Sequence, residues 1–349
     1  MTQKKARYII IGAGLSGLTT AFKLHQKGET NVLILEARDR IGGRIMTENH
    51  IDFGATWFQN HHENLSSLIE EVAVEKFHQF SDGKSVLVYN SMAPAHYFEN
   101  DPKYPSAFRI AGGSAALIEK LASFYTEQIH TNTVVSEIKE VDNQIFISTN
   151  NGNYIADKVI VTIPPRIATN IIFSPELPAH LIHDMKNTHT WMSNAMKVGL
   201  TFKTPFWKVK GFSGTLIGQI GCVTELYDHC CADEKTFALM GFVNEALRDL
   251  SKEERKAKIL AYLQKYLGDE VLNYVTYEEK DWSQDGFTAS SDIKSIYMSP
   301  RYGNSKFQEF YLNGKLLFSG AETSSIHGGY MDGAVFSGLK VAEKILSQE

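Results

Sequence analysis

The first 36 residues alternate between short apolar runs and one stretch with helical spacing. An apolar run at residues 8–11 is typical of a strand that is buried on both faces of a parallel sheet. A glycine-rich turn follows it, and residues 15–26 then place apolar side chains at helical spacing until Gly28 ends the pattern. A second apolar run covers residues 31–35. This order predicts a β–α–β unit at the start of the chain.

Further along the chain, three segments have the pattern of strands: residues 132–141, 144–149 and 154–162. Residues 150–152 supply a hairpin turn between the last two. Residues 201–241 are rich in aromatic and β-branched side chains, which predicts a second sheet. Residues 252–267 are typical of a charged amphipathic helix, and a last strand and helix are expected at 315–319 and 330–346. Sheet patterns near both ends of the chain, around a different middle, predict a discontinuous domain that another domain interrupts.

Composition and charge narrow the class of protein. At about 150 residues per domain, a chain of 349 residues forms two domains or one large one. The net charge of −5 indicates no basic face, so nucleic acid is not expected as a partner. No run of 18 consecutive apolar residues occurs, so no membrane span is expected. The three cysteines form no disulfide framework, which favours a reducing compartment and a cytoplasmic location.

One group of residues has the side chains of a metal site without its spacing. His229 lies beside Cys230 and Cys231, but this arrangement fits no common zinc pattern. Ordinary core or surface positions are the better interpretation of these residues. The sequence therefore assigns no metal ligands.

The glycines between the first strand and the first helix carry the first chemical signal. Gly12, Gly14 and Gly17 have the spacing of a dinucleotide-binding turn and stand between a strand and a helix, as that turn requires. The start of the helix then offers free N–H groups to a pyrophosphate. Glu36 ends the second strand, where its carboxylate can accept hydrogen bonds from ribose hydroxyls and would repel the 2′-phosphate of NADP.

The residues after Glu36 distinguish between NAD and FAD. The run Glu-Ala-Arg-Asp-Arg-Ile-Gly-Gly-Arg at 36–44 places three arginines and two glycines directly after the ribose carboxylate. Guanidinium groups can bind a pyrophosphate or stack on rings, and the glycines let the backbone pass close to a flat ligand. A second glycine-containing segment, Asp-Phe-Gly-Ala-Thr-Trp, follows at 52–57. Together these segments favour FAD over NAD.

These motifs resemble those of the flavin-containing amine oxidase family, which includes monoamine oxidase, polyamine oxidase and L-amino acid oxidase. The family's glutamate–arginine–glycine run and its following Gly-Ala-x-Trp segment both occur here. Further similar motifs occur in the family's order, at Gly112-Gly113, Val135–Ile138, Val161–Pro165, Lys197 ahead of Thr204–Trp207, Phe318–Thr323 and Gly329–Val335. The resemblance extends from end to end of the chain and covers a little under half of it.

The resemblance implies a fold and a division into domains. An α/β fold is expected, with a doubly wound Rossmann-like FAD-binding domain of the glutathione-reductase type and an inserted α+β substrate domain. The FAD-binding domain is expected at residues 1–79, 106–170 and 300–349. The substrate domain is expected at residues 80–105 and 171–299.

The resemblance also implies which residues form the site. Lys197 is expected near flavin N5, through a water, and Tyr330 is expected as one wall of an aromatic slot. A helix that begins near Met331 would stabilise the negative charge of reduced flavin. The residues expected to bind the cofactor are Gly12, Gly14, Gly17, Glu36, Ala37, Arg38, Gly43, Arg44, Thr56, Trp57, Val135, Trp282, Glu322 and Met331.

Three departures from the family's pattern qualify this picture. Residues 283–314 contain no cysteine, so the FAD is expected to be non-covalent. The second aromatic wall of the slot is not assigned, because Phe287 and Tyr297 both fit the spacing poorly. The segment between Phe58 and Gly112 is much shorter than in the animal enzymes, so the helical part of the substrate domain is expected to be reduced.

The expected reaction is oxidation of the C–N bond of a small-molecule amine to an imine, with hydride transfer to flavin N5 and reoxidation by oxygen to give hydrogen peroxide. Two alternatives stay open. One is a flavin-dependent C–C desaturase or oxidase of a larger apolar substrate, such as a porphyrinogen or carotenoid. The other is a non-catalytic flavin-binding redox sensor. An NAD enzyme is less favoured, and the sequence leaves the substrate, the electron acceptor and the oligomeric state open.

Overall fold

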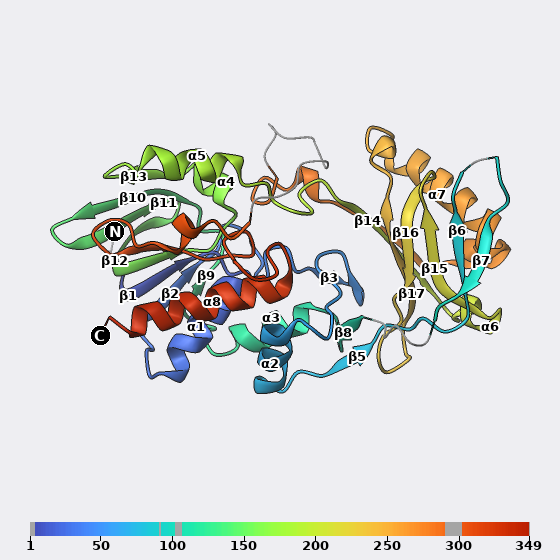
Figure 1. The fold of residues 1–349 in the computed structure, drawn as a ribbon, viewed down its shortest axis with the longest axis horizontal. Coiled ribbons are helices and arrows are strands. Elements are labelled where there is room, and N and C mark those ends of the chain that lie inside the picture. Colours follow the sequence, from blue (N-terminus) through green and yellow to red (C-terminus); the bar gives the residue numbers. More distant parts are fainter. Residues whose placement is uncertain (1–3, 91, 102–106, 290–301, 349) are drawn as a thin grey trace.

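The computed structural model describes residues 4–90, 92–101, 107–289 and 302–348. Two large sheets lie toward opposite ends of an elongated molecule, and both ends of the chain lie at the same side as the first sheet (Figure 1). The chain crosses between the two sheets several times, so neighbours in space come from distant parts of the sequence.

The first sheet has eight strands in the order β13-β10-β11-β12-β1-β2-β9, with β19 paired to β12. Its strands are β1 (Lys4–Ile11), β2 (Val32–Leu35), β9 (Ile129–His130), β10 (Val135–Val141), β11 (Gln144–Thr149), β12 (Gly152–Val161), β13 (Ile172–Ser174) and β19 (Leu316–Phe318). The central pairs are parallel, and Ile10 of β1 lies between Ile34 of β2 and Ile160 of β12. The predicted hairpin of β11 and β12 is antiparallel.

Helices cover both faces of the first sheet (Figure 1). These helices are α1 (Leu15–Gln26), α2 (Glu63–Glu71), α3 (Ala115–Ala122), α4 (Pro165–Ala168), α5 (Ala179–Asn187) and α8 (Met331–Leu346). Because successive strand residues point to opposite faces, Ile10 packs in one hydrophobic cluster with α1 and α8. Ile9 and Ile11 pack in a second cluster, which includes Leu181 of α5. This burial of both faces explains the continuous apolar strands in the sequence.

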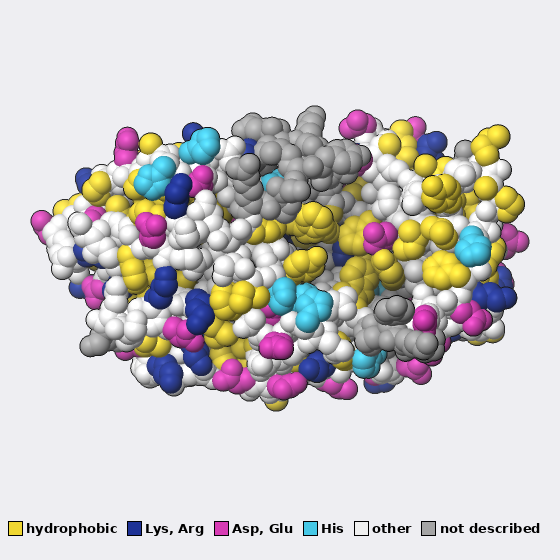
Figure 2. Space-filling model, viewed as in Figure 1, with side chains coloured by type: hydrophobic (Ala, Val, Ile, Leu, Met, Phe, Trp, Pro, Cys, Tyr) yellow, Lys and Arg dark blue, Asp and Glu magenta, His cyan; other side chains and the backbone are white. Residues whose placement is uncertain are grey.

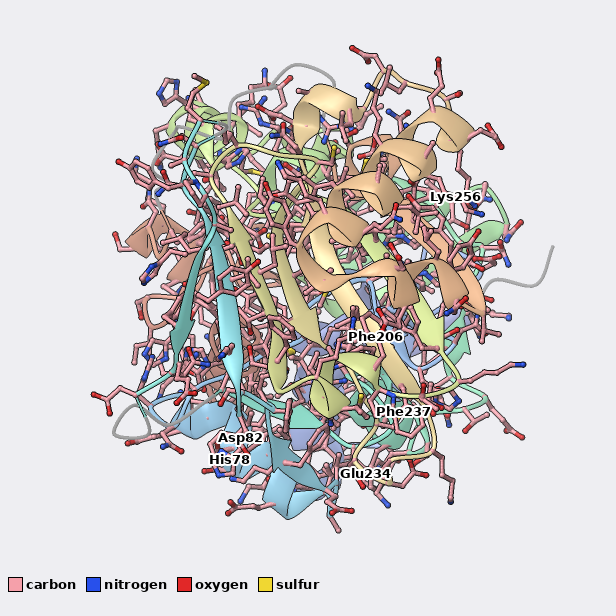
Figure 3. All side chains as sticks on the ribbon, turned by 90° about the vertical axis from the view of Figure 1, so that its right-hand side faces the viewer. His78, Asp82, Phe206, Glu234, Phe237 and Lys256 are labelled. Carbon is pink, nitrogen blue, oxygen red and sulfur yellow. The ribbon has the colours of Figure 1, made fainter. Side chains whose placement is uncertain are left out.

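The second sheet has seven strands in the order β18-β14-β17-β16-β15-β6-β7. They are β6 (Lys84–Val88), β7 (His96–Glu99), β14 (Met196–Phe202), β15 (Phe212–Gly218), β16 (Val223–Asp228), β17 (Phe237–Val243) and β18 (Thr276–Asp281). Helix α7 (Lys252–Leu267), which carries Lys256, lies across the strands (Figure 3). Its buried Ile259, Leu263 and Leu267 belong to the same hydrophobic cluster as the strands. Short helix α6 (Phe206–Val209) ends the connection from β14.

The opposite face of the second sheet packs against a segment that follows β3 (Thr47–Glu48) and begins with β4 (Ile51–Asp52). Ile51 and Phe53 are buried against Ala238 and Met240 of β17. A side chain at Gly199 of β14 would lie within 2.7 Å of Ile51 Cδ1, so this glycine allows the close approach. Strands β5 (Lys76–His78) and β8 (Phe108–Ile110) form an antiparallel pair, in segments of the chain that run between the two large sheets. The packing of Ile51 and Phe53 against β17 joins the two halves of the molecule.

The predicted α/β fold with a parallel Rossmann-like sheet and a separate mixed sheet is confirmed. The predicted second sheet is larger than residues 201–241, because β6, β7 and β18 join it from other parts of the chain. The division into domains stays a proposal. Strand β13 pairs with β10, and α5 packs with the first sheet, so a boundary drawn by sheet membership would follow α5 rather than residue 170. Among the described residues, no helix is long and apolar enough to cross a membrane.

Candidate functional site

A cavity lies beyond the carboxyl ends of β1, β2, β12 and β19, where parallel α/β sheets bind their ligands. It contains about 1550 Å³ of empty space, its opening to solvent included. The residues predicted to bind the cofactor or substrate that line it are Gly12, Gly14, Glu36, Ala37, Arg38, Gly43, Arg44, Val135, Trp282, Tyr330 and Met331. Gly17, Thr56, Trp57, Lys197 and Glu322, predicted for the same site, are not among its lining residues.

The three glycines of the first turn have three different roles. Gly12 has a φ of +109°, which an L side chain rarely adopts, and it makes the turn after β1. A side chain at Gly17 would lie 2.2 Å from the carbonyl oxygen of Gly12, so Gly17 allows α1 to approach the turn. A side chain at Gly14 would meet no atom within 4 Å, because this residue faces the open cavity. Gly14 therefore keeps the backbone accessible to a ligand.

Two helices begin at this cavity without a side-chain cap. The N-cap of helix α1 is Gly14, which has no side chain. The N-cap of α8 is Tyr330, whose side chain accepts no hydrogen bond from the first turn. By contrast, Ser251 at the start of α7 forms a complete capping box with Glu254. Uncapped N–H groups and the positive end of the helix dipole bind anions. The cavity therefore offers two separate anion-binding helix ends.

Glu36 joins the glycine turn to the arginine-rich segment. Its Oε2 atom accepts a hydrogen bond from Ala13 N at 2.9 Å, and its Oε1 atom accepts one from Arg38 N at 2.9 Å. The side chain is buried and lines the cavity. Each carboxylate oxygen has a second lone pair, so Glu36 can hold the turn in place and still accept a bond from a ligand hydroxyl.

The arginines after Glu36 are held by partners that the sequence did not reveal. Arg38 forms an ion pair of 2.6 Å with Asp285 and donates to Thr288. Both guanidinium ends of Arg44 reach the buried Glu322, each at 2.8 Å. The predicted Glu322 thus acts on the cavity through Arg44. A carboxylate placed nearly 250 residues from its arginine leaves no sequence signal, which is why Asp285 was missed.

Several residues line the end of the cavity beside Glu36, where the sequence predicts a ribose. Val135, at the start of β10, lines the cavity there, and so do Phe287 and Thr288. The Arg38 guanidinium lies 5.3 Å from the centre of the Phe287 ring. Phe287 therefore lies on the Arg38 side of the cavity. Tyr297, the other residue considered for the second aromatic wall, lies outside the described residues.

Trp282 and Trp57 are both anchored by their indole N–H groups. Trp282 lines the cavity and donates to the carbonyl oxygen of Phe53 at 2.8 Å. Trp57 donates to Gln79 at 2.8 Å, and its ring meets that of Tyr227 at a centroid distance of 4.8 Å. Trp57 therefore packs against the inner face of the second sheet, next to the cavity-lining Ala55.

Lys197 is fully buried on β14 and makes three hydrogen bonds. Its Nζ atom donates to the carbonyl oxygens of Asp52 and Gly54, at 3.0 and 2.6 Å, and contacts Thr56 Oγ1 at 2.9 Å. The pKa of Lys197 is lowered to about 7, chiefly because the side chain is buried; the Asp52 carboxylate opposes this shift and the nearby Arg109 adds to it. Because Gly54 lines the cavity, Lys197 acts on the cavity wall through the segment it binds.

The polar cluster behind Lys197 is also buried. Asp52 is fully buried, and burial raises the pKa of its carboxyl group. His229, which the sequence predicts at an ordinary core or surface position, accepts a hydrogen bond from Asp52 N at 3.0 Å. Arg109 donates to the carbonyl oxygen of Cys230. These contacts give His229 a structural role next to the lysine.

Tyr330 stands where the second uncapped helix begins. It lines the cavity and is 56% exposed, so one side of its ring faces open space. Trp191 and Met192, which the sequence analysis did not select, line the cavity as well. They lie in a loop before β14 with no motif to mark them. Tyr330 and Trp191 supply aromatic surface to the wall of the cavity.

A family model described as flavin-containing amine oxidoreductase matches residues 15–102 and 87–346. The chain belongs to this family. The family is flavin-containing, which implies FAD as the cofactor. The resemblance found in the sequence is confirmed.

Members of this family from several eukaryotes match along nearly the whole chain. A probable flavin-containing monoamine oxidase A of Dictyostelium discoideum is 25% identical over 444 aligned positions, covering 97% of this chain and 96% of that protein. Amine oxidase A of the horse, Equus caballus, is 26% identical over 453 positions, covering 97% and 84%. These alignments are longer than the 349 residues of this chain, so the relatives contain residues that have no counterpart here.

Solved structures show the same fold. Putrescine oxidase bound to putrescine is 22% identical, has a TM-score of 0.87, and covers 99% of this chain and 100% of that one. Cyclohexylamine oxidase from Brevibacterium oxydans is 20% identical, has a TM-score of 0.85, and covers 98% and 99%. The likeness therefore extends over both sheets of this chain.

Alanine at Gly14 and at Gly17 should have opposite effects. Gly17→Ala should lower the free energy of unfolding by about 1–3 kcal/mol, because its methyl group would overlap the Gly12 carbonyl oxygen. Gly14→Ala should leave the FAD-free protein as stable as before, because its methyl group meets only open space. That methyl group should instead weaken FAD binding by about tenfold or more. Urea unfolding and FAD titration of the FAD-free proteins measure the two effects, and tight FAD binding by Gly14→Ala would contradict this assignment of the cavity.

The lowered pKa of Lys197 predicts a pH-dependent difference in stability. Between about pH 7 and pH 10.5, the unfolded chain binds a proton at Lys197 that the folded protein does not. The free energy of unfolding of the wild type, minus that of Lys197→Met, should therefore rise with pH across this window and stay flat below it. Urea unfolding at a series of pH values measures the difference. Lys203→Met, which removes an exposed lysine just beyond β14, is the control and should show no such rise.

Proposed function

We propose that this protein is an FAD-dependent oxidase that converts a small-molecule amine and oxygen to an imine and hydrogen peroxide, and that it binds FAD without a covalent bond. The observation that carries the proposal is a cavity with two uncapped helix ends and a buried glutamate, in a chain of the amine oxidoreductase family. The two helix ends match the two places where FAD is negatively charged during the reaction, its pyrophosphate and its reduced ring.

The described residues fit FAD along the length of the cavity. Glu36 would accept hydrogen bonds from a ribose hydroxyl while it holds the glycine turn. The free N–H groups of α1 would bind the pyrophosphate, because Gly14 leaves them open to the cavity. The start of α8, at Met331, would lie at the reactive end of the cofactor and stabilise negative charge there. Arg44 stays oriented through its ion pair with Glu322.

When bound, FAD supplies the hydride acceptor, its N5 atom, and the reduced cofactor then reacts with oxygen. The protein's part is to bind the amine in its neutral form, to orient its reacting carbon, and to exclude water. Tyr330 and Trp191 give the cavity an aromatic wall against which a substrate would pack. We assign Tyr330 to contact with the substrate.

Lys197 is proposed to act on the reactive end of the cofactor. Its ammonium holds Asp52 and Gly54 by their carbonyl oxygens, and so fixes the segment that forms one cavity wall. Thr56 Oγ1 accepts a hydrogen bond from the same nitrogen atom, behind that wall. Because its pKa is lowered to about 7, Lys197 can hold or release a proton near neutral pH. Trp57 would cover the same region from the side of the second sheet.

The absence of a covalent bond has a direct test. Residues 283–314 contain no cysteine, so acid precipitation of the yellow protein should leave all of the flavin in the supernatant as FAD. Absorbance and chromatography of the supernatant measure the released cofactor. Flavin that stays with the precipitated polypeptide would contradict the non-covalent assignment. A protein that cannot be loaded with FAD would contradict the whole proposal.

A panel of primary and secondary amines tests the reaction. At least one amine should bleach the oxidised flavin without oxygen and yield hydrogen peroxide with it. Hydride transfer needs the nitrogen lone pair, and an alkylamine with a pKa of about 10.4 is neutral in fewer than about one molecule in a thousand at pH 7. Reduction at subsaturating amine should therefore accelerate from about pH 7 towards pH 9. Stopped-flow absorbance measures the rate.

The same assay includes substrates of the competing reactions. A porphyrinogen and a polyene have no amine titration, so bleaching by either would not accelerate in this way with pH. Bleaching by one of them, with none by any amine, would favour the C–C desaturase. A flavin that no compound bleaches would favour a non-catalytic redox sensor.

A further inference from the structure

Three histidine side chains from two distant segments meet beside the cavity. His61 and His62 come directly before α2, and His327 lies in the loop before α8. Their ring centres are 4.7, 4.8 and 5.3 Å apart. One ring nitrogen from each histidine lies within 4.8 Å of the others. Figure 2 shows histidine side chains next to hydrophobic ones near the middle of one face. The side chain of His61 is exposed.

These separations suit a single tetrahedral metal ion. With metal–nitrogen bonds of about 2.0–2.1 Å, three imidazoles around one zinc ion have ring centres roughly 5 Å apart. All three observed ring separations lie close to this distance. Small side-chain rotations would bring the nitrogen atoms to ligand distance.

A buried carboxylate already orients one of the three rings. His327 Nδ1 lies 2.7 Å from Asp332 Oδ2, and Asp332 is fully buried in the first turn of α8. The same carboxylate accepts bonds from Leu65 N and Asn64 Nδ2, at 2.8 and 3.0 Å, which fix its position. Because an ionised carboxylate only accepts, His327 carries its proton on Nδ1 and leaves Nε2 free to bind a metal. This carboxylate–histidine pair is the usual support of a metal-binding histidine.

We propose that His61, His62 and His327 form a binding site for one Zn²⁺ ion, with Asp332 as the group that orients His327. Three neutral nitrogen ligands suit zinc and similar transition metals, while Mg²⁺ and Ca²⁺ prefer oxygen. The fourth ligand would be water, because the side chain of His61 is exposed. The sequence assigned no metal ligands, because His327 lies 265 residues after His62 and the three histidines share no motif.

Binding at this site would have one cost and one consequence. His62 Nδ1 accepts a long hydrogen bond of 3.3 Å from Gln59 N, which ligation would weaken or replace. The ion would tie the start of α2 to the loop that leads into Tyr330, whose ring lies 5.3 Å from that of His62. Zinc would therefore restrict the movement of Tyr330 at the cavity wall. The site goes beyond the proposed oxidase activity and does not depend on it.

The test is a zinc titration of tag-free, FAD-loaded protein at neutral pH. Competition with a chromophoric zinc chelator should show one ion bound per chain, and excess Mg²⁺ should not displace it. Zinc should also raise the thermal unfolding temperature of the wild type, because a ligand that binds only the folded state stabilises it. Co²⁺ in place of Zn²⁺ should give the intense visible bands of a four-coordinate site. None of these readouts uses amine turnover, so failure of this proposal is distinct from failure of the oxidase proposal.

Variants then locate the ion. His61→Asn and His327→Asn should each weaken zinc binding by about tenfold or more and remove the thermal shift, and Asp332→Asn should weaken it by about 10–100-fold. His96→Asn, which removes an exposed histidine on β7, is the matched control and should bind zinc like the wild type. Since His61 is exposed, its variant should fold normally, which its unfolding temperature without zinc will verify. A wild type that does not compete with the chelator would overturn the proposal. Equal zinc binding by the wild type, His61→Asn and His327→Asn would overturn it too.

Discussion

The close crossing of α1 and α8 is the constraint on which the site depends. A side chain at Gly338 of α8 would lie 2.6 Å from the Ser16 carbonyl oxygen of α1, and a side chain at Gly17 would overlap the Gly12 carbonyl oxygen. Only glycine lets the two helices and the turn approach to this distance. The approach brings two uncapped helix ends into one cavity, although the helices come from opposite ends of the chain. An anionic ligand could then bind to both ends at once.

A second contact joins the cavity to the other sheet. The segment from Ile51 to Trp57, which begins with strand β4, packs against the inner face of the second sheet, where Lys197 holds it by its carbonyl oxygens. Burying a lysine is unfavourable, and its lowered pKa reflects that cost. Three hydrogen bonds offset part of the cost and make the position of the segment specific. The cavity wall and the second sheet are therefore coupled through one buried amine.

The charged groups around the cavity bind one another as well as any ligand. Glu36 holds Ala13 and Arg38, Arg38 holds Asp285, and Arg44 holds Glu322. Such pairs keep side chains with many rotamers in one conformation before a ligand arrives, so less conformational entropy is lost on binding. The cavity described here is in this sense preorganised.

The sequence predicted the first β–α–β unit and its dinucleotide-binding turn, but not every strand of the fold. Its apolar runs and glycine spacing depend on local geometry, so β1, α1, β2 and the Glu36 position could be predicted from nearby residues alone. The extra strands β6, β7 and β18 of the second sheet could not, because pairing between distant segments leaves no local pattern. Only the folded structure shows that Asp285 pairs with Arg38 and that Lys197 lies behind the cavity wall rather than in it. It alone also brought His327 to His61 and His62, since packing of α2 against α8, and not sequence spacing, sets those distances.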